Sequence, residues 1–575
     1  MARLFRLLKP YTASIFVIIV LLFVQVISDL YLPTLMADLV DIGIVNHDIQ
    51  FIIEIGGYML LVAVGGTVCA IMATYLSSKT AIGFAKLVRE KLFGKVESFS
   101  LHEFDKFGTA TLITRTTNDV TQLQQVSILI LSMMVTAPLT GIGGVIMALK
   151  QDSSLAWVLV VVIPILFMII GATLFKGLPL FKLMQVKLDK LNLVLRENLT
   201  GIRVIRAFNR IDKEKVRFDN ANSDLMNNAI KINLIMAVLM PMMMLIMNVT
   251  TVALIWFGAI RIDEGTMQIG SLMAFIQYAT QILFSLLMLA MLFIMIPRAH
   301  VSAVRINEVL QTDLDIFDSK ELKSKISVRG LVEYIGVSFR YPGAVQPALI
   351  NITFSAKPGE LTAIIGGTGS GKTTLINLMM RFYDVESGCV LVDGVDVREM
   401  SQKALRAKIG FVPQETALFS GTITENIKYG KEDATFEEIN YAADVAQATE
   451  FILTMEDGFD HTIAQGGTNI SGGQKQRLSI ARALVRKPEI YIFDDSFSAL
   501  DFKTDAKLRA ALKLEIAEST VFLIAQSVST VRDADRIIVL DNGRIVGIGM
   551  HKELLYTCKV YREIVASQLS EEELG

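Results

Sequence analysis

Long stretches without charged side chains divide the first half of the chain. Each is close to or longer than the roughly 20 residues that a helix needs to cross about 30 Å of hydrocarbon. Because a helix satisfies its own backbone polar groups in lipid, the pattern predicts six transmembrane helices. The charge-free stretches are residues 10–28, 55–78, 120–149, 153–175, 232–260 and 265–297.

Basic residues in the connecting segments set the orientation. No Lys or Arg occurs from residue 10 to 78, whereas residues 79–119 and 176–231 are rich in both. These basic segments are expected in the cytoplasm, together with both chain ends. Their apolar spacing has a helical period, so we expect the membrane helices to continue into the cytoplasm. The alternative is a small soluble insert.

After Arg298 the pattern changes. Residues 311–328 are polar, and period-2 alternation typical of strands follows. The expected organisation is a membrane domain at 1–310, a linker at 311–330 and a soluble α/β domain at 331–575. The fold class is an α-helical membrane domain with six transmembrane helices plus an α/β P-loop nucleotide-binding domain.

Composition agrees with a membrane protein. Of the 575 residues, 52% are hydrophobic and 19% charged, against about 25% charged in soluble domains. The net charge of −2 gives no basic field for nucleic acid, so no nucleic-acid partner is expected. Three widely spaced cysteines fit free thiols in a reducing compartment and suggest no zinc site.

A glycine-rich loop lies between an apolar run ending at Ile365 and a helical pattern from Thr374 onward. It matches the phosphate-binding motif G-x-x-x-x-G-K-[ST], in which backbone N–H groups and a helix N-terminus hold phosphate oxygens. Lys372 is expected to reach the β- and γ-phosphates and Thr373 to bind Mg²⁺. The predicted ATP-binding residues here are Gly366, Gly367, Thr368, Gly369, Ser370, Gly371, Lys372, Thr373 and Thr374.

Two further segments narrow the class of NTPase. Asp494 ends a second buried strand, where a Walker B aspartate holds Mg²⁺. Ser471-Gly472-Gly473-Gln474 opens a helix, with Ser471 as a natural N-cap. A strand end with Asp and a capped helix are common in proteins, but both of them together with the P-loop are typical of one family of ATP-binding proteins.

The sequence resembles the ATP-binding cassette (ABC) exporters of type I, which have six membrane helices ahead of the nucleotide-binding domain. Ser471 to Gln474 match the family signature, and Gln414 matches the Q-loop glutamine, implying roles in Mg²⁺ binding and catalysis. Tyr341 matches the aromatic that stacks on adenine, and residues 498–501 match the D-loop. The resemblance implies two cassettes with ATP between one chain's P-loop and the other chain's signature.

Two positions depart from the family pattern. Asp495 stands where the family has a Glu that polarises the attacking water, and Gln526 stands where it has the switch-loop His. The shorter Asp495 loses roughly 1.5 Å of reach, and displacement of about 1 Å can cost on the order of 10²-fold in rate. We therefore expect Asp495, Gln526 and Gln414 to form a degenerate catalytic set that still binds Mg-ATP.

The resulting hypothesis is one half of a heterodimeric multidrug exporter in the cell membrane. Its own P-loop would form the slow ATP site, and its signature would complete a competent site on a second ABC half-transporter. Amphipathic small molecules are the expected cargo. The alternatives are a slow homodimer, an exporter of lipid, haem or peptide, and an ATP-gated channel or regulatory subunit.

The cytoplasmic segments around Phe104–Arg115 and Arg206–Glu214 are expected to act as coupling helices, with Phe208 as an anchor. Asp29, Asp38 and Asp41 are expected to be solvated at the outer end of the first helix, although intramembrane carboxylates are functional candidates by default. The fifth membrane segment is rich in methionine, which suits an adaptable wall.

Overall fold

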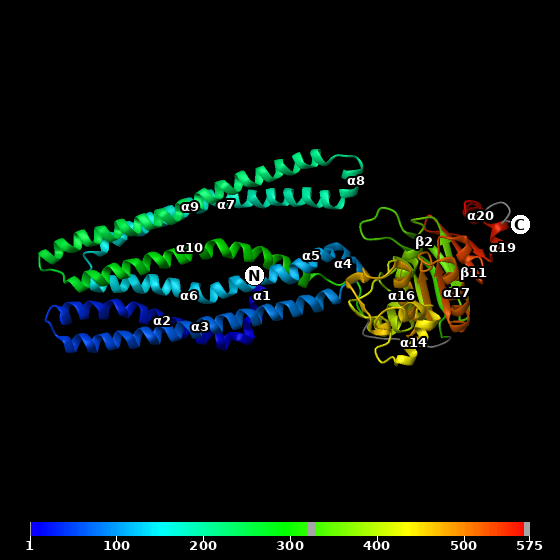
Figure 1. The fold of residues 1–575 in the computed structure, drawn as a ribbon, viewed down its shortest axis with the longest axis horizontal. Coiled ribbons are helices and arrows are strands. Elements are labelled where there is room, and N and C mark those ends of the chain that lie inside the picture. Colours follow the sequence, from blue (N-terminus) through cyan, green and yellow to red (C-terminus); the bar gives the residue numbers. More distant parts are fainter. Residues whose placement is uncertain (1, 319–328, 569–575) are drawn as a thin grey trace. The chain divides into compact units, whose positions relative to one another are not determined.

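The computed structural model describes residues 2–318 and 329–568, so the expected linker at 311–330 lies partly outside the described residues. The chain forms two compact units. The first comprises residues 1–97 and 109–312, and the second comprises residues 98–108 and 313–575 (Figure 1). Residues 98–108, which lie between two membrane helices in the sequence, therefore pack with the nucleotide-binding unit.

The membrane unit contains six helices that are long and apolar enough to cross a bilayer, as predicted. Several run well beyond a bilayer's thickness because they continue into the predicted cytoplasmic segments. Their bounds are α2 Thr12–Asp38, continued by a π-helical turn at Leu39–Ile44, α3 Ile49–Glu97, α6 Val120–Gln151, α7 Ala156–Thr200, α9 Ile211–Asp263 and α10 Ile269–Gln311.

Short helices join these spans. The N-terminus has α1 and a 3₁₀ turn, the first cytoplasmic loop has α4, α5 and a π-helical turn, and the second loop has α8. Gly108 separates α4 from α5 with a φ of 72°, which supplies the glycine break expected there. The bounds are α1 Ala2–Phe5, 3₁₀ turn Arg6–Tyr11, α4 Leu101–Phe107, α5 Thr109–Thr114, π-helical turn Arg115–Asp119 and α8 Ile202–Ala207.

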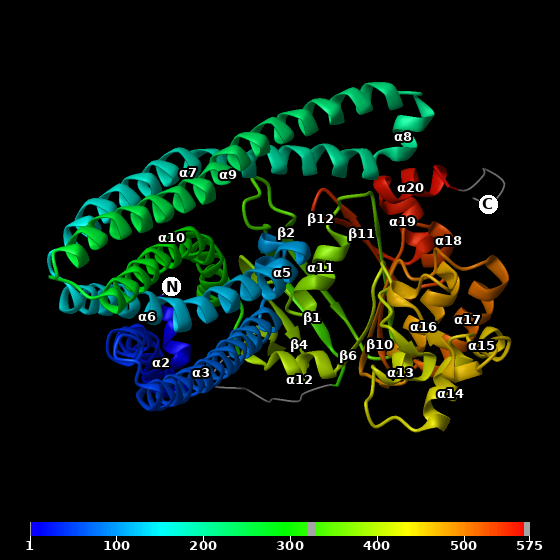
Figure 2. The same cartoon turned by 60° about the vertical axis from the view of Figure 1, so that its left-hand side comes forward.

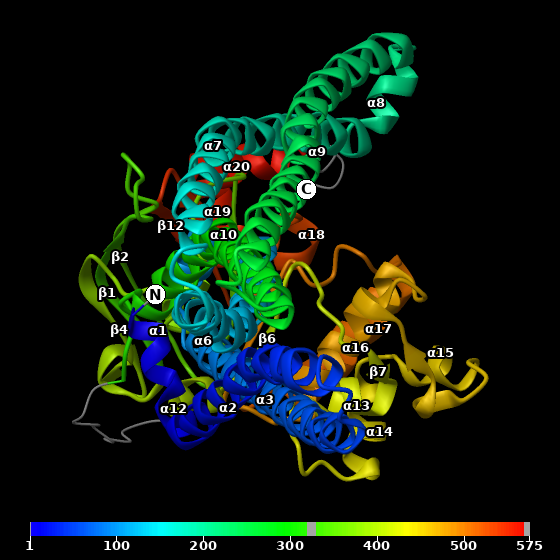
Figure 3. The same ribbon diagram turned by 90° about the vertical axis from the view of Figure 1, so that its left-hand side faces the viewer.

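Two groups of helices make up the membrane unit. The first group pairs α2 with α3 and α6 with α10 (Figure 3). In the second, α7 and α9 run side by side, with α8 at the cytoplasmic tip (Figure 2). Phe208 directly follows α8 and is 73% exposed, so the tip presents an apolar side chain. The two groups share a core near the outer ends of the helices, which includes Phe275 and Leu254.

Small residues allow the first helices to pack closely. A Cβ at Gly66 of α3 would lie 3.0 Å from the Cβ of Ser28 on α2, closer than Cβ atoms ordinarily pack, so glycine allows the two helices to approach here. Near the outer surface, Asp41 accepts hydrogen bonds from the backbone N–H groups of Gly270 and Ser271, at 2.6 and 3.1 Å. Asp41 thus stabilises the N-terminus of α10 instead of being merely solvated.

The second unit contains two main sheets and a small third one. The antiparallel sheet has the order β2-β1-β4-β5, and the larger sheet has the order β12-β11-β3-β10-β9-β6. In the larger sheet all neighbouring pairs are parallel except β11 with β12. The strands are β1 Val332–Phe339, β2 Leu349–Ala356, β3 Leu361–Gly366, β4 Ser387–Val392, β5 Val395–Asp396, β6 Ile409–Val412, β7 Gly421–Thr422, β8 Thr462–Ile463, β9 Ile490–Asp494, β10 Thr520–Ile524, β11 Arg536–Asp541 and β12 Arg544–Gly549.

The interior strands of the parallel sheet are buried on both faces, which explains their continuous apolar runs. Helices and loops cover the sheet and complete three hydrophobic clusters. The helices are α11 Lys372–Met379, α12 Gln402–Ala407, α13 Ile423–Lys428, α14 Phe436–Val445, α15 Thr449–Leu453, α16 Gly472–Leu484, α17 Phe502–Glu515, α18 Val528–Val531, α19 His551–Thr557 and α20 Lys559–Ala566.

Candidate functional site

Four loops meet at one edge of the parallel sheet. They follow β3, β10, β9 and β6, which are consecutive neighbours in that order. Ligands of such sheets bind outside the carboxyl ends of the strands. The P-loop, Gln526, Asp494 with Asp495, and Gln414 follow these four strands respectively, so the sheet brings the sequence-predicted residues to one edge.

The P-loop is Gly366 to Thr374, between β3 and α11. Helix α11 begins at Lys372, two residues earlier than the sequence pattern predicts. A Cβ at Gly366 would collide with the carbonyl oxygen of Leu540. Gly371 has a φ of 101°, and a Cβ there would lie 2.8 Å from the carbonyl oxygen of Ala348. These two glycines are therefore required by the backbone path itself.

Polar groups in this loop are arranged to receive an anion. The Lys372 ammonium donates hydrogen bonds to the carbonyl oxygens of Gly366 and Gly367, at 2.8 and 2.9 Å. Burial lowers the pKa of Lys372, against the opposing charges of Asp494 and Asp495. The Ser370 hydroxyl oxygen is buried without a hydrogen-bond partner in the described residues. The Lys372 ammonium, which lies against the loop backbone, and the Ser370 hydroxyl are therefore groups that could bind a phosphate.

Oxygen ligands for a hard cation lie next to Lys372. Thr373 is the second residue of α11, and Asp494 is the last residue of β9. Burial raises the pKa of Asp494, with Asp495 adding to the shift, while Thr373 and Lys372 oppose it. A bound divalent cation would relieve this unfavourable charge. Hydroxyl, carboxylate and amide oxygens are the donors that Mg²⁺ accepts, so Thr373, Asp494 and Gln414 fit the predicted set.

Asp495 and Gln526, the two departures from the family pattern, are in contact. The Gln526 amide donates to the Asp495 carboxylate at 3.2 Å, and the Gln414 amide approaches the same oxygen at 3.5 Å. Asp495 has a φ of 46°, in the left-handed region that costs free energy for a non-glycine residue. Burial raises its pKa, and the charge of Lys372 opposes this.

Tyr341 lies just beyond β1 and reaches the start of α11. Its hydroxyl is 3.0 Å from that of Thr374, the last residue of the P-loop set. Its ring makes edge-to-face contacts with Phe339 and Tyr383, at centroid distances of 4.9 and 5.3 Å. Tyr341 is therefore positioned beside the phosphate-binding loop, and Tyr383 is a supporting aromatic that sequence reasoning missed.

The signature residues lie at the N-terminus of α16. Ser471 accepts a hydrogen bond from the Gln474 backbone, and the Gln474 side chain accepts one from the Ser471 backbone. This capping box is the structural role that Ser471 and Gln474 have in the described residues. A Cβ at Gly473 would lie 3.1 Å from the carbonyl oxygen of Ala499, whereas one at Gly472 would meet open space. No hydrogen bond between the described residues joins this group to the P-loop.

The D-loop, residues 498–501, lies between the two groups. The Ser498 hydroxyl donates to the Asp495 carbonyl oxygen at 3.0 Å, and Ala499 packs on Gly473 of the signature. The D-loop therefore contacts both the residue after the Walker B aspartate and the start of the signature helix.

Gln568 is a second residue that the sequence did not reveal. Its side-chain amide donates to the Gln526 carbonyl oxygen and accepts from the Val528 backbone N–H, both at 2.8 Å. It thereby brackets the switch segment from beyond α20. Its contacts join residues 40 and 42 positions apart, so no local motif signals them.

The first coupling segment is tied to the nucleotide-binding unit by Glu103 of α4. Its carboxylate accepts hydrogen bonds from the Ser100 and Asp315 backbone N–H groups, both at 2.6 Å. Burial disfavours its charge, but the hydrogen bonds from Ser100 and Asp315 outweigh this and lower its pKa. His102 adds an ion pair to Asp315. Residues 313–318, which follow α10, thus contact α4 directly.

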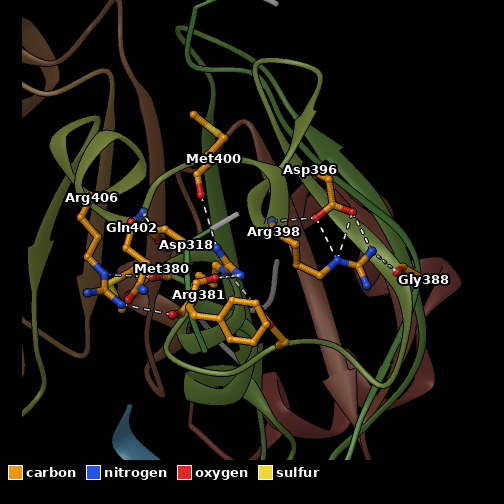
Figure 4. Close-up of polar contacts among 11 residues, drawn as sticks. Asp318, Met380, Arg381, Gly388, Asp396, Arg398, Met400, Gln402 and Arg406 are labelled. Carbon is orange, nitrogen blue, oxygen red and sulfur yellow. Dashed lines mark hydrogen bonds and ion pairs between the residues drawn. The ribbon is translucent and has the colours of Figure 1, made fainter. Parts of the chain in front are cut away.

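Arg381 is buried and contacts the last residues of the stretch 313–318 (Figure 4). Its guanidinium donates to the Phe317 and Met400 carbonyl oxygens and to Asp384, at 3.0–3.3 Å. Asp318 lies within ion-pair distance of Arg381 and accepts a hydrogen bond from the Gln402 backbone. Residues 313–318 are therefore held by α4 through Asp315 and by Arg381 through Phe317 and Asp318.

The architecture is that of a P-loop ATPase joined to a six-helix membrane permease. Residues 15–297 match the ABC transporter transmembrane region, and residues 349–498 match the ABC transporter family model. An uncharacterized ABC transporter ATP-binding protein of Mycobacterium tuberculosis is 44% identical over 99% of this chain and 98% of its own length. The chain belongs to the ABC transporter family.

Two further comparisons refine the class. A fatty acid ABC transporter ATP-binding/permease protein of M. tuberculosis is 34% identical, covering 83% of this chain and 75% of that protein. The structure of a bacterial Atm1-family ABC exporter with ATP bound has a TM-score of 0.81 at 24% identity, covering 97% and 98% of the two chains, and shares the fold. This chain is thus a multi-pass membrane protein with a cytoplasmic nucleotide-binding domain, and as an ABC exporter it couples ATP hydrolysis to transport and works as a dimer.

Proposed function

We propose that this chain is the half of a heterodimeric exporter that carries the slow ATP site. The contact between Gln526 and Asp495 carries the proposal. Asp495 is one methylene shorter than Glu, and its carboxylate is hydrogen-bonded by the Gln526 amide. In the proposed site, this carboxylate would have to polarise the attacking water. A second half-transporter with Glu and His at these positions would supply the fast site.

The binding functions of the site do not depend on that defect. The P-loop glycines, Ser370 and Lys372 would hold the phosphates, and Tyr341 would stack on adenine. Thr373, Asp494 and Gln414 would hold Mg²⁺, which neutralises phosphate charge when bound. ATP bound between this P-loop and the partner's signature would serve mainly to keep the two cassettes together.

The signature supports a competent site on the partner. Ser471 and Gln474 form a complete capping box, and the N-terminus of α16 is a positive dipole end suited to a γ-phosphate. A chain whose own catalytic pair is weak but whose signature is regular contributes most by completing the partner's site. In a homodimer both sites would share the short carboxylate, which makes this the slower alternative.

Amphipathic small molecules are the proposed cargo, because the membrane unit is apolar with few polar positions. The fatty acid transporter among the relatives supports a second candidate, export of a lipid-like acid. ATP-dependent gating of a channel is a third candidate, since one slow site is also sufficient for gating.

Two measurements test the proposal. ATP hydrolysis by the purified chain alone should be slow, and it should rise by at least about tenfold with a partner that carries Glu and His at the matching positions. Brisk turnover by the chain alone would refute the degenerate site. ATP-dependent accumulation of an amphipathic dye in inside-out vesicles separates a pump from a channel, because a channel only equilibrates the dye.

A further inference from the structure

Asp29 of α2 contacts the middle of two other membrane helices, α3 and α10, although its position directly after the first charge-free stretch predicts the outer end. Its side chain is next to Gly66 of α3, at 3.9 Å from a Cβ built there. Its carbonyl oxygen accepts a hydrogen bond from Gln281 of α10 at 3.1 Å. Gly66 is central in the charge-free stretch 55–78, and Gln281 is central in the stretch 265–297. Two neighbouring helices therefore place Asp29 near half depth.

A small polar group surrounds this carboxylate. Gln25 lies one turn earlier on α2 and is partly buried. The Gln281 side-chain oxygen is buried and has no hydrogen-bond partner in the described residues. Asp29 itself is exposed. In the described membrane unit, no Lys or Arg forms an ion pair with Asp29. An unpaired carboxylate at this depth is costly and marks a functional position.

An apolar pocket begins one helical turn outward from Asp29. It has a volume of about 550 Å³, in the range of pockets that hold a drug-sized molecule. Leu32 follows Asp29 by three residues, about 4.5 Å along the helix axis. Helices α2, α3 and α10 form its walls, and the lining residues are Leu32, Met36, Gly56, Met59, Leu60, Ala63 and Gln277.

We propose that this pocket and Asp29 bind one amphipathic organic cation, with its apolar body against Leu32, Met36 and Met59 and its positive group at Asp29. The inference rests on the proposed export of amphipathic molecules and names their charge. Charge complementarity selects the occupant, because attraction between the cation and the carboxylate offsets the cost of removing both charges from water. The two methionines can adjust to cargoes of different shape. An amphipathic anion would meet repulsion at the same point.

Two ions of the same shape and opposite charge provide the test. Saturable binding of tetraphenylphosphonium and tetraphenylborate is measured without ATP on the full chain in nanodiscs, with empty nanodiscs subtracted. Wild type should prefer the phosphonium. Asp29→Asn should weaken phosphonium binding by about tenfold or more, the scale of one lost ion pair, and leave borate binding unchanged or tighter. Asp29→Glu should stay within about threefold of wild type.

Asp48→Asn is the matched control. Asp48 lies in the outer turn and accepts a hydrogen bond from the Phe51 backbone, which Asn can replace. The same loss of charge there should leave phosphonium binding unchanged. Equal binding of both ions by wild type, no saturable phosphonium binding, or no effect of Asp29→Asn would overturn the proposal. Asp29→Asn would also have no effect if a basic residue of a partner chain formed an ion pair with Asp29. If Asp29→Asn weakened the binding of both ions equally, the charge of Asp29 would not be responsible for the selectivity.

Because binding is measured without nucleotide, this test is independent of the proposed function. If the chain binds the phosphonium selectively but accumulates no dye with ATP, the binding site is supported and the proposed export is contradicted. If dye accumulates equally in wild type and Asp29→Asn, export is supported and the proposed site is contradicted.

Discussion

The Gln526 side-chain amide donates a 3.2 Å hydrogen bond to the Asp495 carboxylate, so the two residues that depart from the ABC pattern satisfy each other. Two independent defects would be expected to leave separate unpaired groups. Here the Gln526 amide occupies one Asp495 carboxylate oxygen, and the Gln414 amide lies 3.5 Å from the same oxygen. In the proposed slow site, this is the carboxylate that would polarise the attacking water.

Lengthening this carboxylate should restore hydrolysis. Asp495→Glu adds the missing methylene, and we expect ATP turnover of the isolated chain to rise by about tenfold or more, since about 1 Å of misplacement can cost 10²-fold. Steady-state phosphate release measures the change. Asp495→Asn is the control and should lower any residual rate. If Glu leaves turnover unchanged, the length of the side chain is not the limiting factor.

Gln568 should control the order of the switch segment. Removing its amide with Gln568→Ala frees the Gln526 carbonyl oxygen and the Val528 N–H, which are two hydrogen bonds worth about 0.5–1.5 kcal/mol each. Hydrogen exchange at Val528 should accelerate by at least about threefold, while the P-loop stays protected. Ser567→Ala, one residue earlier, is the matched control. Unchanged exchange at Val528 would show that the bracket does not hold the segment in solution.

Glu103 should make the docking of α4 sensitive to acid. Its pKa is lowered in the folded protein, so its ionised form contributes stability that is complete above the ordinary carboxyl pKa and is lost as the pH falls through the lowered value. Glu103→Gln turns an N–H₂ group towards backbone donors and should cost about 1.5–3 kcal/mol at neutral pH. The protection of residues 101–107 from hydrogen exchange is compared between pH 7 and about pH 3, well below the ordinary carboxyl pKa.

The matched control for Glu103 is Glu90→Gln. Glu90 is exposed and pairs with Lys86 across one helical turn at 3.6 Å, so its loss should change exchange little. In Glu103→Gln the protection of α4 should be low throughout and nearly independent of acid. A wild-type protein whose α4 protection has no acid dependence would contradict the role of the carboxylate.

Arg381 should be irreplaceable by lysine. A single ammonium cannot span Asp384 and the carbonyl oxygens of Phe317 and Met400, so Arg381→Lys leaves buried acceptors unpaired. A loss of about 2 kcal/mol would lower the Tm of the nucleotide-binding unit by roughly 4–8 °C. Arg398→Lys is the control in the same region, because the Arg398 side chain is 39% exposed and its partner Asp396 keeps the hydrogen bond from the residue 398 backbone N–H (Figure 4). Equal Tm values for the two variants would refute the anchoring role.

The elements that local pattern determines were predictable from sequence. Six charge-free stretches predicted the membrane helices, and the spacing from Gly366 to Thr373 predicted the phosphate loop, because both depend on consecutive residues. The depth of Asp29 was not predictable in this way. It follows from contacts with Gly66 and Gln281, which belong to other helices, and a window count along α2 alone places it at the edge.

The same reasoning explains the residues that were missed. Gln568, Glu103 and Arg381 act through backbone groups far away in the sequence, and a backbone donor or acceptor leaves no residue-type signal. Asp41 was expected to be solvated because it is charged and near the outer surface, yet the free N–H groups of α10 provide it with partners. Asp41 and Glu103 thus accept hydrogen bonds from backbone N–H groups at the starts of helices, a role that the sequence alone did not indicate.

The bracket formed by Gln568 has a practical consequence for handling the protein. A tag or fluorescent fusion inserted directly after Gln568 is joined to the residue whose side chain holds the Gln526 backbone. Comparisons of ATPase rates between preparations should therefore use tags at the amino terminus, or verify that removing a carboxy-terminal tag leaves the rate unchanged.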